Sequence, residues 1–181
     1  MSKRINHGKV FEEDIRNSAL EQGLWFYRIK DISPMMLKPN VRLSKNDYDS
    51  FIYKKPNLFP IELKSTKSKS LSLSESMVKK HQIESLKKAA DTDGVIPGFL
   101  VNFREPKNRV FFININEFLK YKNIAENGLD HTYEGRVNKA SIPIHIVEQI
   151  GIEVQGEKKR TRYRYKLNKL IQELILDYKC V

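Results

Sequence analysis

The sequence reads NDYD at residues 46–49 and, after a turn, FPIELKSTK at residues 59–67. The second stretch is typical of a strand, on which Glu62 and Lys64 share one face because residues two apart point to the same side. Asp47 lies on the strand that we expect to pair with it. Two carboxylates beside an ammonium group form a plausible cradle for a divalent metal and a water. The two stretches therefore predict a central strand pair and a candidate catalytic site.

The remaining sequence predicts a single mixed α/β domain, because helical and strand periodicities alternate without a repeat or a low-complexity linker. We expect one domain over residues 1–181, with a polar tail at 1–7 and a basic segment at 155–181 that ends in a helix. The predicted strands are 24–30, 48–53, 58–65, 95–103, 109–115 and 162–166, and the predicted helices are 9–22, 72–90, 117–123, 143–150 and 168–178.

Three local patterns carry specific expectations. Pro60 cannot donate to a sheet ladder, so it predicts an edge or a bulge in its strand. The segment SLSE at residues 72–75 has the capping-box pattern and predicts the start of the second helix. Aromatic residues on a strand are usually core, which is the reading favoured for residues 25–27 over stacking on bases.

The composition limits the class of partner. The chain has 181 residues, a formal charge of +11 and one cysteine, Cys180. The charge favours a polyanionic partner, although many small basic proteins bind nothing charged specifically. A lone cysteine excludes an intramolecular disulfide and a cysteine-rich zinc site. No apolar run approaches the ~20 residues of a membrane span, so we expect a cytoplasmic protein that does not bind a membrane.

The candidate site fits hydrolysis of a phosphodiester. This reaction requires a nucleophilic water, a Lewis acid on the phosphate and charge relief for the leaving oxygen. Mg²⁺ keeps several waters, so Glu62, Asp47 and the backbone carbonyl of Leu63 suffice as protein ligands. Lys64 would orient the water and stabilise the phosphate. Taken alone, Glu-Leu-Lys is better explained as a strand edge with solvated side chains, and it is the predicted hairpin with an acidic residue on the partner strand that favours a site.

The chain resembles the PD-(D/E)xK nuclease superfamily, and within it the RecU-type Holliday-junction resolvases and their phage relatives. The resemblance covers about residues 8 to 120. It rests on GKVFE at 8–12, Asp47-Tyr48, IELKSTK at 61–67 with the serine-rich segment after it, HQI at 81–83, and Gly98-Phe99 with Asn102-Phe103. It implies a restriction-endonuclease-like fold, with a central mixed five-stranded sheet flanked by helices.

Site roles follow from the resemblance residue by residue. Asp47, Glu62 and the Leu63 carbonyl would bind Mg²⁺, for which Mn²⁺ could substitute. Lys64 would be the catalytic lysine, Glu12 an auxiliary acidic residue, and Gln82 would orient water or phosphate. Asp49 is a rival to Asp47 that periodicity cannot separate, since both lie on one strand face. The Asp-Tyr pair of the RecU pattern favours Asp47.

The resemblance also implies a DNA substrate. RecU-type resolvases carry a long stalk ahead of the catalytic aspartate, but only residues 31–45 are available here, so junction preference is less well supported than nuclease chemistry. We expect a homodimer of phage or bacterial origin that acts on branched or duplex DNA. The alternatives are a restriction or end-processing nuclease, or a non-catalytic DNA-binding module. The predicted phosphate contacts are Arg28, Lys30, Lys67, Lys69, Lys79, Lys80, Lys159, Arg160, Arg162 and Arg164.

Overall fold

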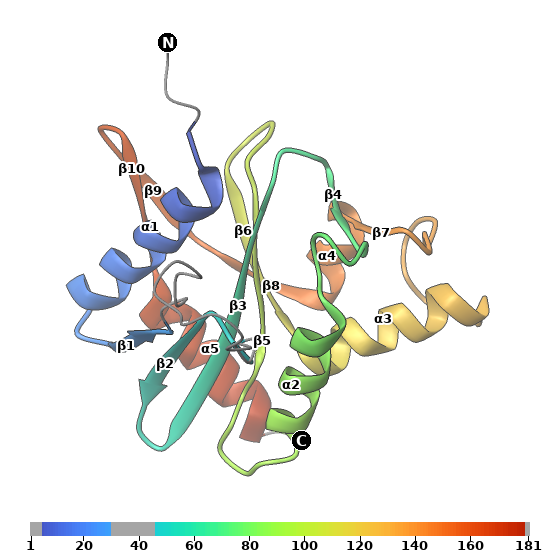
Figure 1. Cartoon of the computed structure of the whole chain (residues 1–181), viewed down its shortest axis with the longest axis horizontal. Coiled ribbons are helices and arrows are strands. Elements are labelled where there is room, and N and C mark those ends of the chain that lie inside the picture. The colour runs from blue at the N-terminus through green and yellow to red at the C-terminus, as the bar shows by residue number, and fades with distance from the viewer. Residues whose placement is uncertain (1–4, 30–45, 180–181) are drawn as a thin grey trace, which may run out of the picture.

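A computed structural model describes residues 5–29 and 46–179, without the side chains of the last two of these. Its centre is a mixed six-stranded sheet in the order β1-β2-β3-β5-β6-β8, with helices on both faces (Figure 1). The strands are β1 Trp25–Arg28, β2 Ser50–Lys54, β3 Asn57–Thr66, β4 Ser70–Ser72, β5 Gly98–Phe103, β6 Arg109–Asn114, β7 Ser141–Pro143, β8 Gly151–Val154, β9 Gly156–Lys159 and β10 Arg162–Tyr165. The helices are α1 His7–Glu21, α2 Lys80–Ala90, α3 Ile115–Asn127, α4 Ile144–Ile150 and α5 Leu167–Lys179.

The strand β3 organises the sheet. It pairs antiparallel with β2 and parallel with β5, which makes the sheet mixed. Its ladder with β2 ends at Ser50 opposite Ile61, whereas its ladder with β5 continues to Thr66 opposite Phe103. The second half of β3 therefore has β5 on one side and has left β2 on the other.

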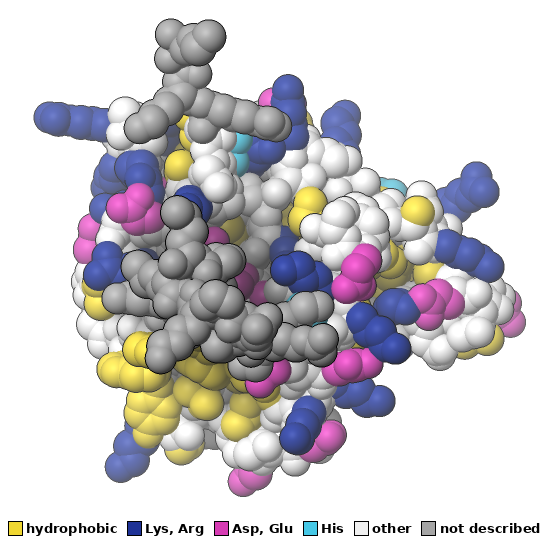
Figure 2. Space-filling model, viewed as in Figure 1, with side chains coloured by type: hydrophobic (Ala, Val, Ile, Leu, Met, Phe, Trp, Pro, Cys, Tyr) yellow, Lys and Arg dark blue, Asp and Glu magenta, His cyan; other side chains and the backbone are white. Residues whose placement is uncertain are grey.

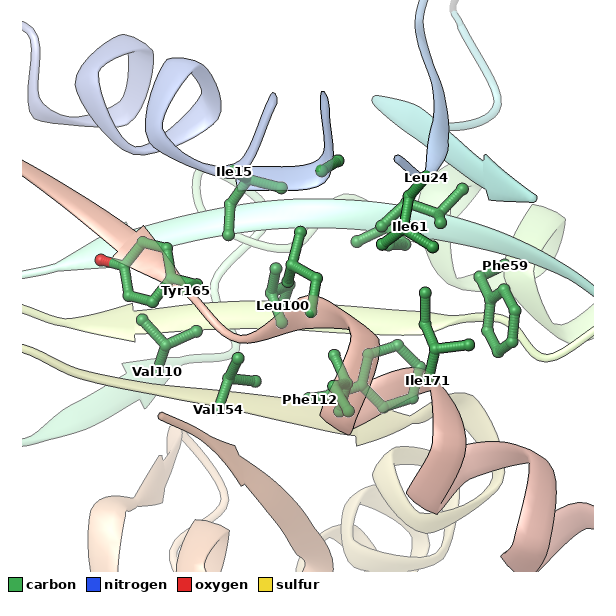
Figure 3. Packing of buried hydrophobic residues seen from close by; sticks show 14 of the residues in the cluster. Ile15, Leu24, Phe59, Ile61, Leu100, Val110, Phe112, Val154, Tyr165 and Ile171 are labelled. Carbon is green, nitrogen blue, oxygen red and sulfur yellow. The ribbon is translucent and has the colours of Figure 1, made fainter. Parts of the chain in front are cut away.

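Each face of the sheet buries its own core. On one face α1 and α5 pack over Ile61, Leu100 and Phe112, as Figure 3 shows. On the other face α2, α3 and α4 pack over Phe99 and Phe111. Fully burying one such side chain contributes about 1.5–3 kcal/mol, so two cores hold β3 and β5 rigidly between the helices.

Helix boundaries follow from capping. Asn6 precedes α1 and its side-chain oxygen accepts a hydrogen bond from the Lys9 backbone N–H at 3.1 Å. Asn114 does the same at the start of α3, where it accepts from the Asn116 N–H at 2.9 Å. Gly128 ends α3 with φ of 64°, in the left-handed region that glycine tolerates.

The predicted α/β class and the element order are confirmed. The observed sheet has six strands instead of five, because residues 151–154 form β8 beside β6. The sequence analysis also missed β9, which pairs with β10 in a separate hairpin. Both strands are four residues long, too short for alternation to be visible. The division into one domain with a tail and a basic segment stays a prediction.

The predicted helix start at the serine-rich segment is wrong. Residues 70–72 form β4, which pairs with β7, and α2 begins only at Lys80. The serine hydroxyls bond locally instead: Ser72 Oγ accepts from the backbone N–H of Ser74 at 3.2 Å. Serine side chains compete with helical hydrogen bonds in this way, so the capping-box pattern gave a false start.

Pro60 lies in an interior strand, contrary to the prediction of an edge or a bulge. It stands opposite Phe51 of β2, and β5 flanks β3 on the other side. The N–H of Leu58, two residues earlier, bonds to the Gly94 carbonyl on the β5 side. Strand N–H groups alternate in direction, so the missing Pro60 donor would point the same way. The regular ladder with β5 begins only at Ile61, and the sheet therefore tolerates the proline.

The aromatic strand is only partly core, contrary to the reading favoured from sequence. Trp25 and Tyr27 are 54% and 53% exposed, whereas Phe26 between them packs against the core. Alternation along a strand explains the division, because its two faces meet different surroundings.

Among the described residues, no helix combines the length and the apolar character that crossing a membrane requires.

Candidate active site

The candidate site lies where β2 separates from β3. Asp49 immediately precedes β2, and its carboxylate Oδ2 accepts the backbone N–H of Leu63 at 2.9 Å. The backbone ladder between β2 and β3 ends at Ser50. Beyond that point the Asp49 side chain, in place of a backbone carbonyl of β2, accepts the hydrogen bond from β3. This bond fixes a carboxylate at the fork between the two strands.

Glu62 is the buried centre of the site. It is 1% exposed, and its Oε1 accepts a hydrogen bond from Nε2 of Gln82 on α2. The Gln82 Oε1 in turn accepts from Lys64 Nζ at 2.9 Å and from the Lys79 backbone N–H at 3.2 Å. One amide therefore links the carboxylate and the ammonium of the Glu-x-Lys motif, and holds both against the start of α2.

The second oxygen of Glu62 lacks a hydrogen donor. Within the described part of the chain, Oε2 is buried and has no hydrogen-bond partner. Burial raises the pKa of Glu62 to about 9, and the neighbouring Asp49 carboxylate adds to this rise against the opposing charges of Lys64 and Lys79. Two carboxyl groups this close share a proton or a cation. The arrangement favours a positive charge between Glu62 and Asp49.

Asp47 is directed elsewhere. Its Oδ1 accepts from Ser85 Oγ of α2 at 2.8 Å, and the adjacent Tyr48 hydroxyl donates to the Ser85 carbonyl at 3.0 Å. The Asp-Tyr pair that favoured Asp47 in the sequence therefore attaches the segment before β2 to α2. Asp49 is the aspartate whose carboxylate acts on the pKa of Glu62, and which of the two aspartates binds metal stays a prediction.

The Leu63 carbonyl is placed as expected from sequence. The N–H and C=O of one strand residue point to the same side, and the Leu63 N–H points to Asp49. The carbonyl therefore faces the side that β2 has left, next to the carboxylate. Its role as a metal ligand stays a prediction.

Glu12 lies on the other face of the sheet. The helix α1 packs on the face of Ile61 and Leu63, opposite to Glu62. The Glu12 carboxylate forms an ion pair with Arg28 at 2.7 Å. This pair fixes the edge strand β1 to α1, and the auxiliary role of Glu12 stays a prediction.

Most of the predicted phosphate contacts are engaged within the protein, and Lys30 lies outside the described residues. Arg162 pairs with Glu13 and Asp14, and Arg164 pairs with Glu21, so both anchor β10 on α1. Arg160 lies in the exposed turn between β9 and β10. Three other lysines form ion pairs at the surface: Lys67 with Glu105, Lys80 with Glu84 and Lys159 with Glu157. Exposed pairs are weak, so a DNA phosphate could replace the glutamate in each. Lys69 and Lys79 flank the site, before β4 and at the N-cap of α2.

Two residues of this region escaped the sequence analysis. Ser85 follows Gln82 by three positions on α2, so both point to the same helix face, and that spacing could have indicated it. Asp14 is buried and receives Arg162, a residue 148 positions away. No local pattern reports such a pairing.

The described residues contain no group of three or more histidine, cysteine or acidic side chains that could hold a metal ion. The candidate site consists instead of two carboxylates and a carbonyl, which suits an ion that keeps most of its waters.

Three similarities place the chain among known proteins. The family model described as RecU, Recombination protein U, matches residues 41–169. The SPbeta prophage-derived uncharacterized protein YotM of Bacillus subtilis (strain 168) is 58% identical over 170 residues, which cover 94% of this chain and 87% of that protein. The Archaeoglobus fulgidus Holliday junction resolvase Hjc has a similar structure, with a TM-score of 0.50 over 81% of this chain and 95% of that one.

The family match begins at residue 41, so it leaves out the first helix with Glu12. It extends past residue 120 and includes both predicted aspartates, the Glu-x-Lys motif and the first part of the basic segment. The likeness to Hjc, at 17% identity, shows the fold. The chain belongs to the RecU family, which its motifs resemble and whose model is described as Recombination protein U.

Proposed function

We propose that this protein is a Mg²⁺-dependent endodeoxyribonuclease that cuts branched recombination or replication intermediates. One observation carries the proposal: Glu62 and Asp49 meet at the fork of β2 and β3, with a buried oxygen for which the described residues supply no donor. A protein that only bound DNA would gain nothing from this arrangement, since a buried carboxylate oxygen without a hydrogen-bond donor costs stability.

The residues fit a divalent ion. Glu62, Asp49 and the Leu63 carbonyl offer hard oxygen ligands from one side, which leaves the other positions to water and phosphate. When bound, the ion supplies a Lewis acid to the scissile phosphate. Mn²⁺ accepts the same ligands and is expected to substitute. Asp47 would then support the site by fixing α2 through Ser85.

The remaining residues divide the catalytic work. Lys64 presents an ammonium group to the phosphate and offsets the negative charge that accumulates on it. Gln82 bonds to both Lys64 and Glu62 and so fixes their relative positions. Its Oε1 accepts from Lys64 Nζ at 2.9 Å, and its Nε2 donates to Glu62. Because Gln82 already bonds to both, its amide positions the two groups that bind water and phosphate.

Family membership supports the substrate and the assembly. A RecU-type resolvase acts on four-way DNA junctions, and a homodimer would place one site on each of two strands. The relationship to a prophage-derived protein supports a phage origin. The net charge of +11 supports a polyanionic substrate.

The test is a panel of labelled DNA substrates, consisting of a four-way junction, a matched duplex and a single strand. Each is incubated with Mg²⁺, Mn²⁺ or EDTA. The proposal predicts paired nicks near the branch that appear only with metal. Shortened ends would indicate an end-processing nuclease, and binding without metal-dependent cleavage of any substrate would overturn the enzymatic role.

A further inference from the structure

The face of the sheet that carries Glu62 and Lys64 continues across β2 and β1 as an aromatic surface. Paired residues on neighbouring strands share a face. Leu58 of β3 stands opposite Tyr53, and Tyr53 stands opposite Trp25. Because Leu58 and Glu62 are both even positions of β3, the aromatic residues and the catalytic carboxylate point to the same side.

These aromatic side chains are exposed. Trp25, Tyr27 and Tyr53 are 54%, 53% and 42% exposed, and Figure 2 shows hydrophobic side chains gathered where Figure 1 draws β1 and β2. The rings of Trp25 and Tyr27 are nearly parallel, with an interplanar angle of 11° and centroids 6.0 Å apart. Among the described residues, the helices on this face pack over β5 and β6 instead, which leaves the three aromatic side chains about half exposed.

A groove lies next to this surface, because its lining includes Phe51 and Leu58, which stand opposite Tyr27 and Tyr53. It has a volume of about 610 Å³ and runs between the sheet and α2. Phe51 and Leu58 line one wall, His81 and Lys88 line the other, and Asp47 lies among its lining residues. Leu58 is roughly 13 Å from Glu62 along the strand, which is about four nucleotides at duplex spacing.

We propose that Trp25, Tyr27 and Tyr53 form a stacking surface for unpaired bases of the DNA substrate, beside the catalytic carboxylates. Every base has a flat π-face that stacks on aromatic rings, whereas paired bases inside a duplex are not available to them. The inference rests on the proposed function, and it gives the enzyme a reason to prefer DNA with unpaired bases at a branch.

A second copy of the chain is the other possible occupant, and the area disfavours it. Three half-exposed aromatic side chains offer on the order of 300 Å². A stable protein interface needs about 800 Å² from each partner. The net charge of +11 also favours a polyanionic ligand such as DNA.

Trp25 is the single tryptophan of the chain, so its fluorescence reports on this surface alone. We expect a single strand, and a junction with unpaired bases at the branch, to quench Trp25 emission in EDTA by half or more. A closed duplex of equal length should quench it much less. Trp25→Ala should weaken single-strand binding by about 5- to 150-fold, Trp25→Phe should retain most of the affinity, and Tyr27→Ala should reduce the quenching while keeping the fluorophore.

Leu129→Ala is the matched control, because Leu129 is 46% exposed and lies outside this surface. Equal quenching by duplex and single strand, or unchanged affinity of Trp25→Ala, would overturn the inference. Emission that shifts with protein concentration without DNA would assign the surface to self-association instead. Failure to bind any DNA would overturn the proposed function itself, whereas DNA binding that leaves Trp25 unquenched would overturn this inference alone.

Discussion

At the scale of single residues, the site is organised around one amide. Gln82 donates to Glu62 and accepts from Lys64, so a neutral side chain holds opposite charges in register. The sequence identified all three residues because the Glu-x-Lys spacing and the family resemblance converge on them. Periodicity could not separate Asp47 from Asp49, and the family resemblance favoured Asp47. Both lie before β2, and only the course of the backbone brings Asp49 to β3.

Substitution of the two aspartates tests that choice. We expect Asp49→Asn to lower cleavage by more than about 100-fold, because loss of a ligand exceeds the 10- to 100-fold effect of a supporting residue. Asp47→Asn should cost less than about 10-fold, since it removes only the bond to Ser85. Single-turnover cleavage rates rank the two variants by activity, and Mn²⁺ titration by calorimetry ranks them independently by metal affinity. A larger loss for Asp47→Asn in both would restore Asp47 as the ligand.

The buried Glu62 carboxyl gives the metal-free protein a specific pH dependence. Its pKa is raised from 4.5 to about 9, so the folded state binds a proton more tightly than the unfolded state. The resulting stabilisation is fully present below pH 4.5 and is lost as the pH rises through 9. In EDTA, Glu62→Gln should therefore become more stable relative to the wild type as the pH rises from 5 to 9.

Urea unfolding midpoints at three pH values measure this effect. Glu84→Gln is the control, because the Glu84 side chain is 63% exposed on α2 and forms only a surface ion pair with Lys80. Its difference from the wild type should vary little with pH. A difference between Glu62→Gln and the wild type that stays constant across the range would contradict the linkage.

At the scale of elements, the basic C-terminal run is a hairpin docked on α1. Asp14 is 3% exposed and its Oδ1 accepts from Arg162 Nε at 2.6 Å, while its Oδ2 accepts the Tyr163 N–H at 3.3 Å. Arg162 also donates to the Val10 carbonyl at 3.0 Å. The sequence predicted that this run binds DNA, which stays a prediction, and part of its charge fixes the hairpin in place.

Removal of the buried anchor should destabilise the fold. Asp14→Ala leaves Arg162 without its buried partner, and we expect a loss of about 3 kcal/mol, at the lower end for such pairs because Arg162 is partly exposed. Glu21→Ala, which breaks the exposed pair with Arg164, should cost less than about 1 kcal/mol. Chemical denaturation compares the two, and equal losses would show that the hairpin is not anchored through Asp14.

The exposed end of the same hairpin remains available to DNA. Lys159 and Arg160 lie at its tip, where binding of phosphates would release counterions. The double substitution Lys159→Ala with Arg160→Ala should lower the slope of log affinity against log salt by about 1 for each phosphate that is no longer bound. Lys122→Ala is a control for the loss of a positive charge elsewhere on the surface, since Lys122 lies on α3 and pairs with Glu126. A slope identical to that of the wild type would remove the tip from the DNA interface.

Helices and strands were predictable where the patterned stretch of sequence was long, and not where it covered only three or four residues. The hairpin of β5 and β6 follows from runs of apolar residues such as residues 98–103. The serine-rich segment misled because hydroxyl groups satisfy backbone donors in a strand and turn as readily as at a helix start. The tertiary partner β7 decides between them, and it lies about seventy residues further along the chain.

At the scale of the whole molecule, the sheet separates two tasks. One face, covered by α1 and α5, supplies stability through a continuous core. The other face carries Glu62 and Lys64 between a second core and an exposed aromatic surface. The fold class could be predicted because burial against the two faces of the sheet imposes the periodic spacing of apolar residues along the strands and helices. The sequence could not predict that the helices on this second face leave β1 and β2 uncovered.

The central claim is that Glu62 and its neighbours make this fold a metal-dependent nuclease. Cleavage of a labelled four-way junction by the wild type and by Glu62→Gln, at a series of Mg²⁺ concentrations, tests it most directly. We predict cleavage by the wild type that rises with Mg²⁺ and stops in EDTA, and no cleavage by Glu62→Gln although it still binds the junction. Equal cleavage by both proteins, or cleavage by the wild type in EDTA, would contradict the claim.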